Sequence, residues 1–140
     1  MIFDINMDGN FTRKARLVAG SQKTAPPSSI TCSSVVYKDS VTIVFILESL
    51  NELDTFAHDI GNAYLNAKCR EKVWIDVGTD FGTEKGMVMI IARALYGLKS
   101  SGSAWRAKLA DTLMLLGYKS SKADADIWMK QDFNPNGDLY

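Results

Sequence analysis

The chain has 140 residues, of which 46% are hydrophobic and 23% charged, and its sixteen basic and sixteen acidic residues cancel. These values are typical of one globular domain and exclude a collagen-like or broadly disordered chain. Zero net charge argues against strong autonomous binding of nucleic acid. Basic residues nevertheless gather before residue 38 and between residues 87 and 110. Such stretches form either a groove for an anionic partner or simply solvated faces.

The sequence shows neither a membrane or secretion signal nor a cysteine pattern typical of metal or disulfide sites. No apolar run approaches the roughly 20 residues that span a bilayer, so we expect no membrane contact. The first residues lack the basic-then-apolar order of a secretory signal, which favours an intracellular protein. Cys32 and Cys69 form no Cys-x-x-Cys pair, and His58 is the single histidine. This excludes a zinc finger and a disulfide scaffold.

The first predicted elements are two strands, residues 2–6 and 11–19, joined by a turn through an Asp-Gly pair. Alternation along the second strand places Lys14 and Arg16 on one face, and Arg13 and Ala15 on the other. Residues 20–34 are rich in Pro, Ser and Thr, which indicates a linker.

A helix is predicted next, over residues 41–50, with Asp39 or Ser40 as its cap. It is apolar nearly all round, so we expect it to be buried between layers. Residues 55–60 are predicted to form a strand that ends at Gly61.

Two more strands follow. Residues 73–77 alternate between apolar and polar side chains, as in a half-buried strand. After a glycine-rich loop, residues 87–95 begin with a continuous apolar run, which suits a central strand.

The last predicted elements are a helix and a short strand. The helix is capped by Ser101 or Ser103 and ends at Gly117. Its apolar stripe contains Trp105, Leu109, Leu113 and Leu116. Residues 127–129 begin the strand. This order of elements predicts an α+β fold in which helices back an antiparallel sheet.

The most informative segment is residues 57–64, where Asp59 ends an apolar stretch and a glycine turn follows at once. A carboxylate in this place could bind a divalent metal, while the amides of the turn face an anion. The same pattern also arises when an aspartate only caps the turn after a strand. The pattern alone leaves both interpretations open.

Four blocks resemble, in order and spacing, the reverse transcriptases of copia-type retrotransposons. The first is Lys-Ala-Arg-Leu-Val-Ala at residues 14–19, and the second is Asp-Ile-Gly-Asn-Ala-Tyr-Leu-Asn-Ala at residues 59–67. The third is Ala-Leu-Tyr-Gly-Leu-Lys at residues 94–99, followed by Trp105. The fourth is Gly-Tyr-Lys-Ser-Ser at residues 117–121, followed by Asp124 and Asp126.

The resemblance implies part of the fingers and palm of a right-hand polymerase. Residues from about 1 to 38 would be a fingers hairpin and linker, and about 39–140 part of the fingers and palm. It also assigns roles: Asp59 as the catalytic aspartate and, with the carbonyl of Ile60, a ligand of Mg²⁺ or Mn²⁺. The nucleotide-binding residues implied are Lys14, Arg16, Gly61, Asn62, Ala63, Tyr64, Gly97 and Lys99. Tyr64 would be the aromatic steric gate that excludes a ribose 2′-hydroxyl. A slip of one residue in the first block would favour Arg13 and Ala15 over Lys14 and Arg16.

Two departures from the family pattern limit this expectation. The family usually has Gln-Ala-Pro-Arg where this chain has Ser-Ser-Gly-Ser at residues 100–103, so an arginine is missing. The Tyr-x-Asp-Asp motif is also missing, since no two aspartates are adjacent in the sequence. One carboxylate is a poor site for two Mg²⁺ ions, so we expect weak metal binding and no polymerisation by the isolated chain. Trp105 is expected to be a core residue.

The resemblance therefore predicts a fragment of a retrotransposon reverse transcriptase, an RNA-directed DNA polymerase by family. Its expected partners are an RNA or DNA template-primer, a deoxynucleoside triphosphate and the rest of a Pol polyprotein, with no membrane. The family places such a protein in the cytoplasm, in a virus-like particle. The alternative function is a non-catalytic remnant that binds nucleic acid through its basic stretches.

Overall fold

The computed structural model describes residues 2–5, 13–20, 31 and 33–133. The chain divides into two compact units, each built from two separate segments. The first unit contains Met1–Cys32 and Asn62–Lys108, and the second contains Ser33–Gly61 and Leu109–Tyr140. Helix α2, Ser101–Leu115, begins in the first unit and ends in the second. None of the described helices is long and apolar enough to cross a membrane.

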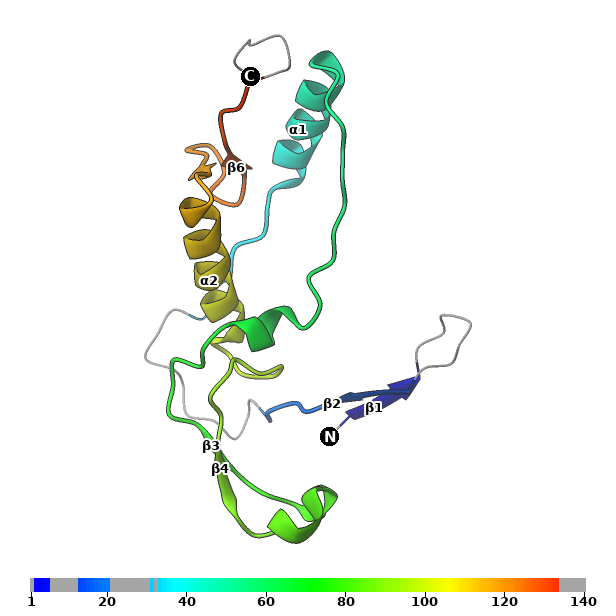
Figure 1. Cartoon of the computed structure of the whole chain (residues 1–140), viewed down its shortest axis with the longest axis vertical. Coiled ribbons are helices and arrows are strands. Elements are labelled where there is room, and N and C mark those ends of the chain that lie inside the picture. The colour runs from blue at the N-terminus through cyan, green and yellow to red at the C-terminus, as the bar shows by residue number, and fades with distance from the viewer. Residues whose placement is uncertain (1, 6–12, 21–30, 32, 134–140) are drawn as a thin grey trace. The chain divides into compact units, whose positions relative to one another are not determined.

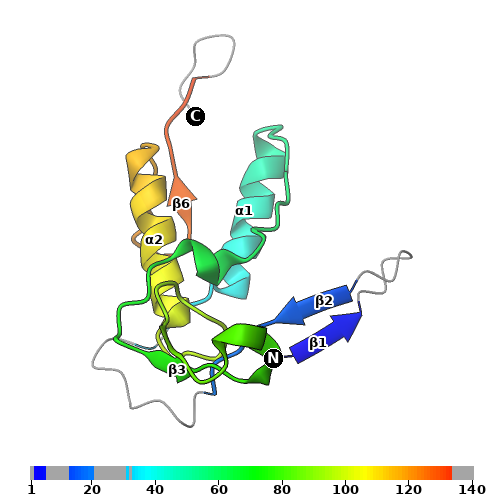
Figure 2. The same ribbon diagram turned by 60° about the horizontal axis from the view of Figure 1, so that its bottom comes forward.

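The first unit opens with the predicted antiparallel hairpin (Figure 2). Strand β1, Ile2–Ile5, pairs with β2, Arg13–Arg16, so that Asp4 lies opposite Lys14. The predicted turn between them lies outside the described residues, as does most of the predicted linker. The two strands confirm that this part of the chain is a hairpin.

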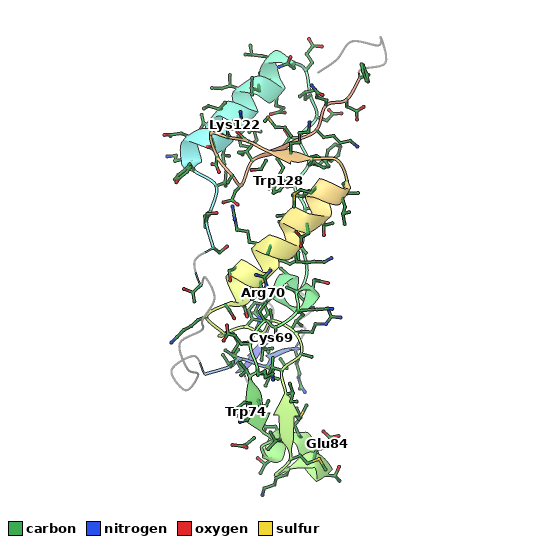
Figure 3. All side chains as sticks on the ribbon, turned by 90° about the vertical axis from the view of Figure 1, so that its left-hand side faces the viewer. Cys69, Arg70, Trp74, Glu84, Lys122 and Trp128 are labelled. Carbon is green, nitrogen blue, oxygen red and sulfur yellow. The ribbon has the colours of Figure 1, made fainter. Side chains whose placement is uncertain are left out.

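A second hairpin joins β3, Trp74–Asp76, to β4, Val88–Ile90, with the short helix η3, Thr79–Glu84, between them. The predicted alternation in β3 is confirmed: Val73 and Ile75 are half-buried and Val77 is buried, while Trp74 is 64% exposed. Figure 3 shows Trp74 on this ribbon. The prediction of a central strand over residues 87–95 is wrong, because β4 has three residues and pairs with β3 alone among the described strands. Its Ile90 is 78% exposed.

The core of the first unit is small and lies where its segments meet. One cluster holds Ala19, Leu95 and Leu98, and the other holds Ala67, Ala94 and Ala104. Trp105 is half-buried against the alanine cluster, which confirms that it is a core residue. The carbonyl of Ala67 accepts a hydrogen bond from the amide of Ala94 at 3.0 Å, which joins the two segments of that cluster.

In the second unit, α1 spans Lys38–Leu50 (Figure 1). The helix begins earlier than predicted, at a Tyr37 cap position without a side-chain cap bond. Asp39 therefore lies in the first turn, where its charge suits the helix dipole, and neither it nor Ser40 is the cap. The predicted burial is wrong: no residue of α1 is buried, and Leu50 is 75% exposed. An apolar helix is buried only when other layers cover it, and the described part of this unit has no such layers.

The second unit also contains a short antiparallel pair, β5, Lys119–Ser120, with β6, Trp128–Met129. Strand β6 confirms the strand predicted at residues 127–129, whereas β5 was not predicted. An apolar groove of about 540 Å³ is lined by α1 on one side and by residues between 121 and 129, β6 included, on the other. Its lining includes Ile43, Val44, Leu47, Ile127 and Trp128; Trp128 is labelled in Figure 3.

Asp124 fixes the segment that precedes α1. Its side chain is only 4% exposed, and its carboxylate accepts hydrogen bonds from the amides of Tyr37 and Asp126, both at 3.0 Å. The hydroxyl of Ser34 donates to the carboxylate of Asp126. The bonds of Tyr37 with Asp124 and of Ser34 with Asp126 join residues 87 and 92 positions apart in the sequence, so they tie together the two segments of the second unit.

The predicted end of α2 is confirmed, but its predicted cap is not. Gly117 follows the helix with φ of 90°, and the amide of Tyr118 donates to the carbonyl of Leu113, as in a left-handed helix end. Ser101 and Ser103 both lie inside the helix. Their hydroxyls donate to the carbonyls of Leu95 and Ser100 rather than accepting from helix amides.

The α+β composition is confirmed, while the single sheet backed by helices is wrong for the described residues. The described strands form three separate antiparallel pairs. Extensive contacts between described elements occur only within those pairs. A two-stranded ribbon buries little surface by itself, so packing in this chain is concentrated at the loop junction around residues 94–98.

Candidate nucleotide-binding site

The turn that carries Tyr64 is built from local backbone hydrogen bonds. Helix η2, Ala63–Asn66, starts after Asn62, whose φ of 52° is left-handed. The carbonyl of Asn62 accepts from the amide of Leu65 at 2.9 Å, and the carbonyl of Tyr64 accepts from the amide of Ala67 at 2.9 Å. Asparagine is one of the few side chains that adopt a left-handed backbone easily, which explains why the sequence turns here.

The side chain of Tyr64 is half-buried in the first unit. It packs against the cluster of Ala67, Ala94 and Ala104. It also contacts the ring of Tyr96, with ring centroids 5.0 Å apart and planes inclined by 47°. Small alanine side chains let a large ring approach closely, so the ring has support from two sides.

Gly97 marks a close approach of two chain segments. Its φ is 90°, and a Cβ atom placed on it would lie 2.0 Å from the carbonyl oxygen of Ala19 and 2.9 Å from Cγ1 of Val18. Next to it, the amide of Ala19 donates to the carbonyl of Tyr96 at 2.8 Å. Both the backbone conformation and the lack of space therefore require glycine here. This gives Gly97 a structural reason to be glycine that is independent of any ligand.

The predicted basic residues lie on exposed parts of the first unit. Arg16 ends β2 and Lys99 follows the Gly97 turn, and both are exposed. Residues 17–19 link β2 directly to the Tyr96–Gly97 segment. The register of β2 places positions 14 and 16 on one face and positions 13 and 15 on the other. This backbone register leaves both pairs as candidates.

Asp59, Ile60 and Gly61 belong to the second unit and are exposed. The strand predicted over residues 55–60 is not formed: residues 53–60 have no regular secondary structure. A strand needs a hydrogen-bonding partner, and no described strand pairs with this segment. The described residues also contain no cluster of three or more His, Cys, Asp or Glu side chains that could hold a metal ion. The described donor set, one exposed carboxylate and its neighbouring carbonyl, does not fit a two-metal centre.

Comparison with known proteins identifies the family. The family described as reverse transcriptase (RNA-dependent DNA polymerase) matches residues 4–137. The chain belongs to the reverse transcriptase family. It is 29% identical over 131 residues to the retrovirus-related Pol polyprotein from transposon RE1 of Arabidopsis thaliana, and 28% identical over 131 residues to that from transposon RE2. It is also 25% identical over 137 residues to the Pol polyprotein from transposon TNT 1-94 of Nicotiana tabacum.

These matches cover 90–93% of this reverse transcriptase chain but only 9–10% of each relative. The chain thus spans about a tenth of the length of the curated relatives that it matches. No solved structure matches it significantly.

The geometry connects three of the blocks that carry the resemblance. Residues 17–19, 63–67 and 94–98 share the two small core clusters of the first unit and the hydrogen bonds between them. Sequence reasoning assigned no role to Tyr96, although it lies inside the third block. The available signal was an aromatic residue directly before a glycine that the turn requires.

Proposed function

We propose that this chain contributes part of the fingers and palm of a retrotransposon reverse transcriptase and forms one side of its nucleotide-binding site. Residues from about 1 to 38 are the fingers hairpin with its linker, and about 39–140 belong to the fingers and palm. The observation that carries the proposal is the convergence of residues 17–19, 63–67 and 94–98 in one unit. Segments with family motifs that pack together despite their separation in sequence are expected at a shared site.

The proposed site uses backbone amides, positive charge and one aromatic ring. Amides of residues 61–64 and the ammonium group of Lys99 face the triphosphate, together with Arg16 and Lys14 from β2. The side chains of Lys99 and Arg16 are both exposed. Tyr64 packs under the sugar and excludes a 2′-hydroxyl by a steric clash, since ribonucleotides and deoxynucleotides pair identically with a template. Gly97 keeps the third block against Ala19.

Asp59 and the carbonyl of Ile60 are the proposed metal ligands of this chain. In two-metal phosphoryl transfer the ions clamp the attacking and leaving oxygens. The described residues do not complete such a centre. The isolated chain is accordingly proposed to bind Mg²⁺ or Mn²⁺ weakly and not to polymerise DNA.

The wider setting follows from the relatives, which are named as retrovirus-related Pol polyproteins. The proposed partners are an RNA or DNA template-primer, a deoxynucleoside triphosphate and the remainder of a Pol polyprotein. The proposed location is the cytoplasm, in a virus-like particle.

Calorimetric titration of the chain with dATP in excess Mg²⁺ tests this proposal. We expect weak binding that Lys99→Ala reduces about three- to tenfold, by loss of one charge-assisted contact. Lys85→Ala is the matched control, since Lys85 is also an exposed lysine of the first unit. If both variants bind dATP as the wild type does, the placement of the triphosphate is wrong.

A second titration, with a primer-template duplex, separates the proposal from the alternative of a non-catalytic remnant. Salt-dependent binding of the duplex that persists in Asp59→Ala, together with no binding of dATP, would favour the remnant. Binding of dATP by the wild-type chain favours the nucleotide site.

A further inference from the structure

We infer that Tyr96 is the positioning residue that sets the ring of Tyr64, and that it thereby determines how strictly the site rejects ribonucleotides. The inference rests on the proposed function, because it concerns the same nucleotide site. It adds a residue to which neither the family motifs nor the comparisons assign a role.

The contact between the two rings is specific. Their centroids lie 5.0 Å apart, within the range of favourable aromatic contacts, and their planes are inclined by 47°, between the offset-stacked and edge-to-face arrangements. Both side chains are half-buried, so the contact between the rings lies at the surface of the first unit rather than deep in its core. Tyr64 also packs against the alanine cluster, whose side chains each offer the ring only a single methyl group. Among the described residues, Tyr96 supplies the other ring in contact with Tyr64.

The backbone of Tyr96 is itself held firmly. Its carbonyl accepts the amide of Ala19 at 2.8 Å, and the next residue, Gly97, lies in direct contact with the Ala19 carbonyl. Leu95 on its other side is buried with Ala19. Tyr96 therefore projects from a junction with tertiary contacts on both sides of it, whereas Tyr64 projects from a single turn of 3₁₀ helix that is tied to the Ala94 amide only at its C-terminal end. The position of the Tyr64 ring is therefore set by the Tyr96 ring that packs against it.

A steric gate discriminates by position. A shift of well under an ångström relieves a clash with one hydroxyl group, because repulsion falls steeply with distance. Loss of the Tyr96 ring is therefore expected to lower the preference for a deoxynucleotide more than its affinity. An aromatic contact of ordinary strength corresponds to about a three- to tenfold change in that preference.

The test uses the 140-residue chain and two ligands, dATP and ATP, each titrated in excess Mg²⁺. Tyr96→Leu removes the ring at similar volume, and Tyr96→Phe retains it. Tyr37→Leu is the matched control, because the side chain of Tyr37 is 69% exposed. We expect Tyr96→Leu to lower the ratio of dATP to ATP affinity about three- to tenfold, mainly through tighter ATP binding. Tyr96→Phe and Tyr37→Leu should keep the wild-type ratio within about twofold.

A nucleotide-free measurement accompanies the titrations. In chains labelled with 3-fluorotyrosine, the ¹⁹F resonance of Tyr64 should move on Tyr96→Leu and stay in place on Tyr37→Leu. Tyr96→Phe loses its own fluorine signal but retains the ring, so it should leave the Tyr64 resonance at its wild-type position and thereby separate the ring contact from a general weakening of the fold.

The outcomes separate the two proposals. A wild-type chain that binds neither ligand overturns the proposed function and this inference with it. A wild-type chain that prefers dATP, with an unchanged preference in Tyr96→Leu, overturns the inference alone. An equal loss in Tyr96→Phe and Tyr96→Leu also overturns it, because the hydroxyl group rather than the ring contact would then be responsible.

Discussion

Replacing Gly97 by alanine tests the junction on which the candidate site depends. The added Cβ would lie 2.0 Å from the carbonyl oxygen of Ala19, so one of the two segments must move. That movement breaks the hydrogen bond from the Ala19 amide to the Tyr96 carbonyl and disturbs the cluster around Leu95. A left-handed backbone costs an L residue about 1–2 kcal/mol, a lost hydrogen bond about 1 kcal/mol and overpacking about 1–3 kcal/mol. Gly97→Ala should therefore lower the free energy of unfolding by at least about 3 kcal/mol.

Two other glycines of the same unit provide matched controls. Gly86 has φ of 87°, close to that of Gly97, but a Cβ there would meet nothing within 4 Å. Gly86→Ala thus measures the cost of the left-handed backbone alone and should lower the free energy of unfolding by about 1–2 kcal/mol. Gly78 has φ of −81° and equally open surroundings, so Gly78→Ala should change stability by less than about 0.5 kcal/mol.

Urea denaturation of the three variants measures these differences, and amide hydrogen exchange at Ala19 locates them. We expect faster exchange at Ala19 only in Gly97→Ala. If Gly97→Ala and Gly86→Ala agree within about 0.5 kcal/mol, the close approach to Ala19 is refuted.

Three further predictions concern the second unit. Asp124→Ala removes the acceptor of two backbone hydrogen bonds and should lower the free energy of unfolding by about 2–4 kcal/mol in urea denaturation. Asp111 is exposed, so Asp111→Ala should change the free energy of unfolding by less than about 0.5 kcal/mol. Equal effects would refute the role of the buried carboxylate. The exposed apolar side chains of α1 are expected to cause self-association of the chain. Leu50→Lys should weaken that association about tenfold in sedimentation velocity and leave the melting temperature unchanged; an unchanged association would contradict a role for α1 in it. Mg²⁺ should bind with a millimolar dissociation constant, and Asp59→Asn should weaken this binding further. A micromolar dissociation constant in calorimetry would contradict a site with a single carboxylate.

Local patterns predicted the elements that depend on near neighbours in sequence. The alternation around Ile75 gave the buried and exposed faces of β3, and Gly117 ended α2 in the left-handed conformation that was expected. Both features are fixed by side-chain period and backbone sterics, so one short segment contains all the information needed.

Which segments pair or pack with each other could not be predicted in the same way. The run at residues 55–60 has strand composition but no described strand as a partner, and α1 has the composition of a buried helix but stays exposed. The composition of a segment indicates which secondary structure it adopts when other elements pack against it. Whether such elements are present depends on residues elsewhere in the sequence.

The same distinction between local sequence patterns and long-range contacts holds for the candidate site. The blocks around Tyr64 and Lys99 were recognisable from their residue order. The contact of Tyr64 with Tyr96, and of Gly97 with Ala19, joins residues up to 78 positions apart and required the structure.

The central claim is that the packed blocks of the first unit form one side of a nucleotide site. The most direct test is a ¹⁵N NMR titration of the chain with dATP in excess Mg²⁺, read residue by residue. We expect the largest shift changes at residues 61–64 and 97–99, with little change along α1. Changes confined to other parts of the chain, or none at saturating dATP, would contradict it.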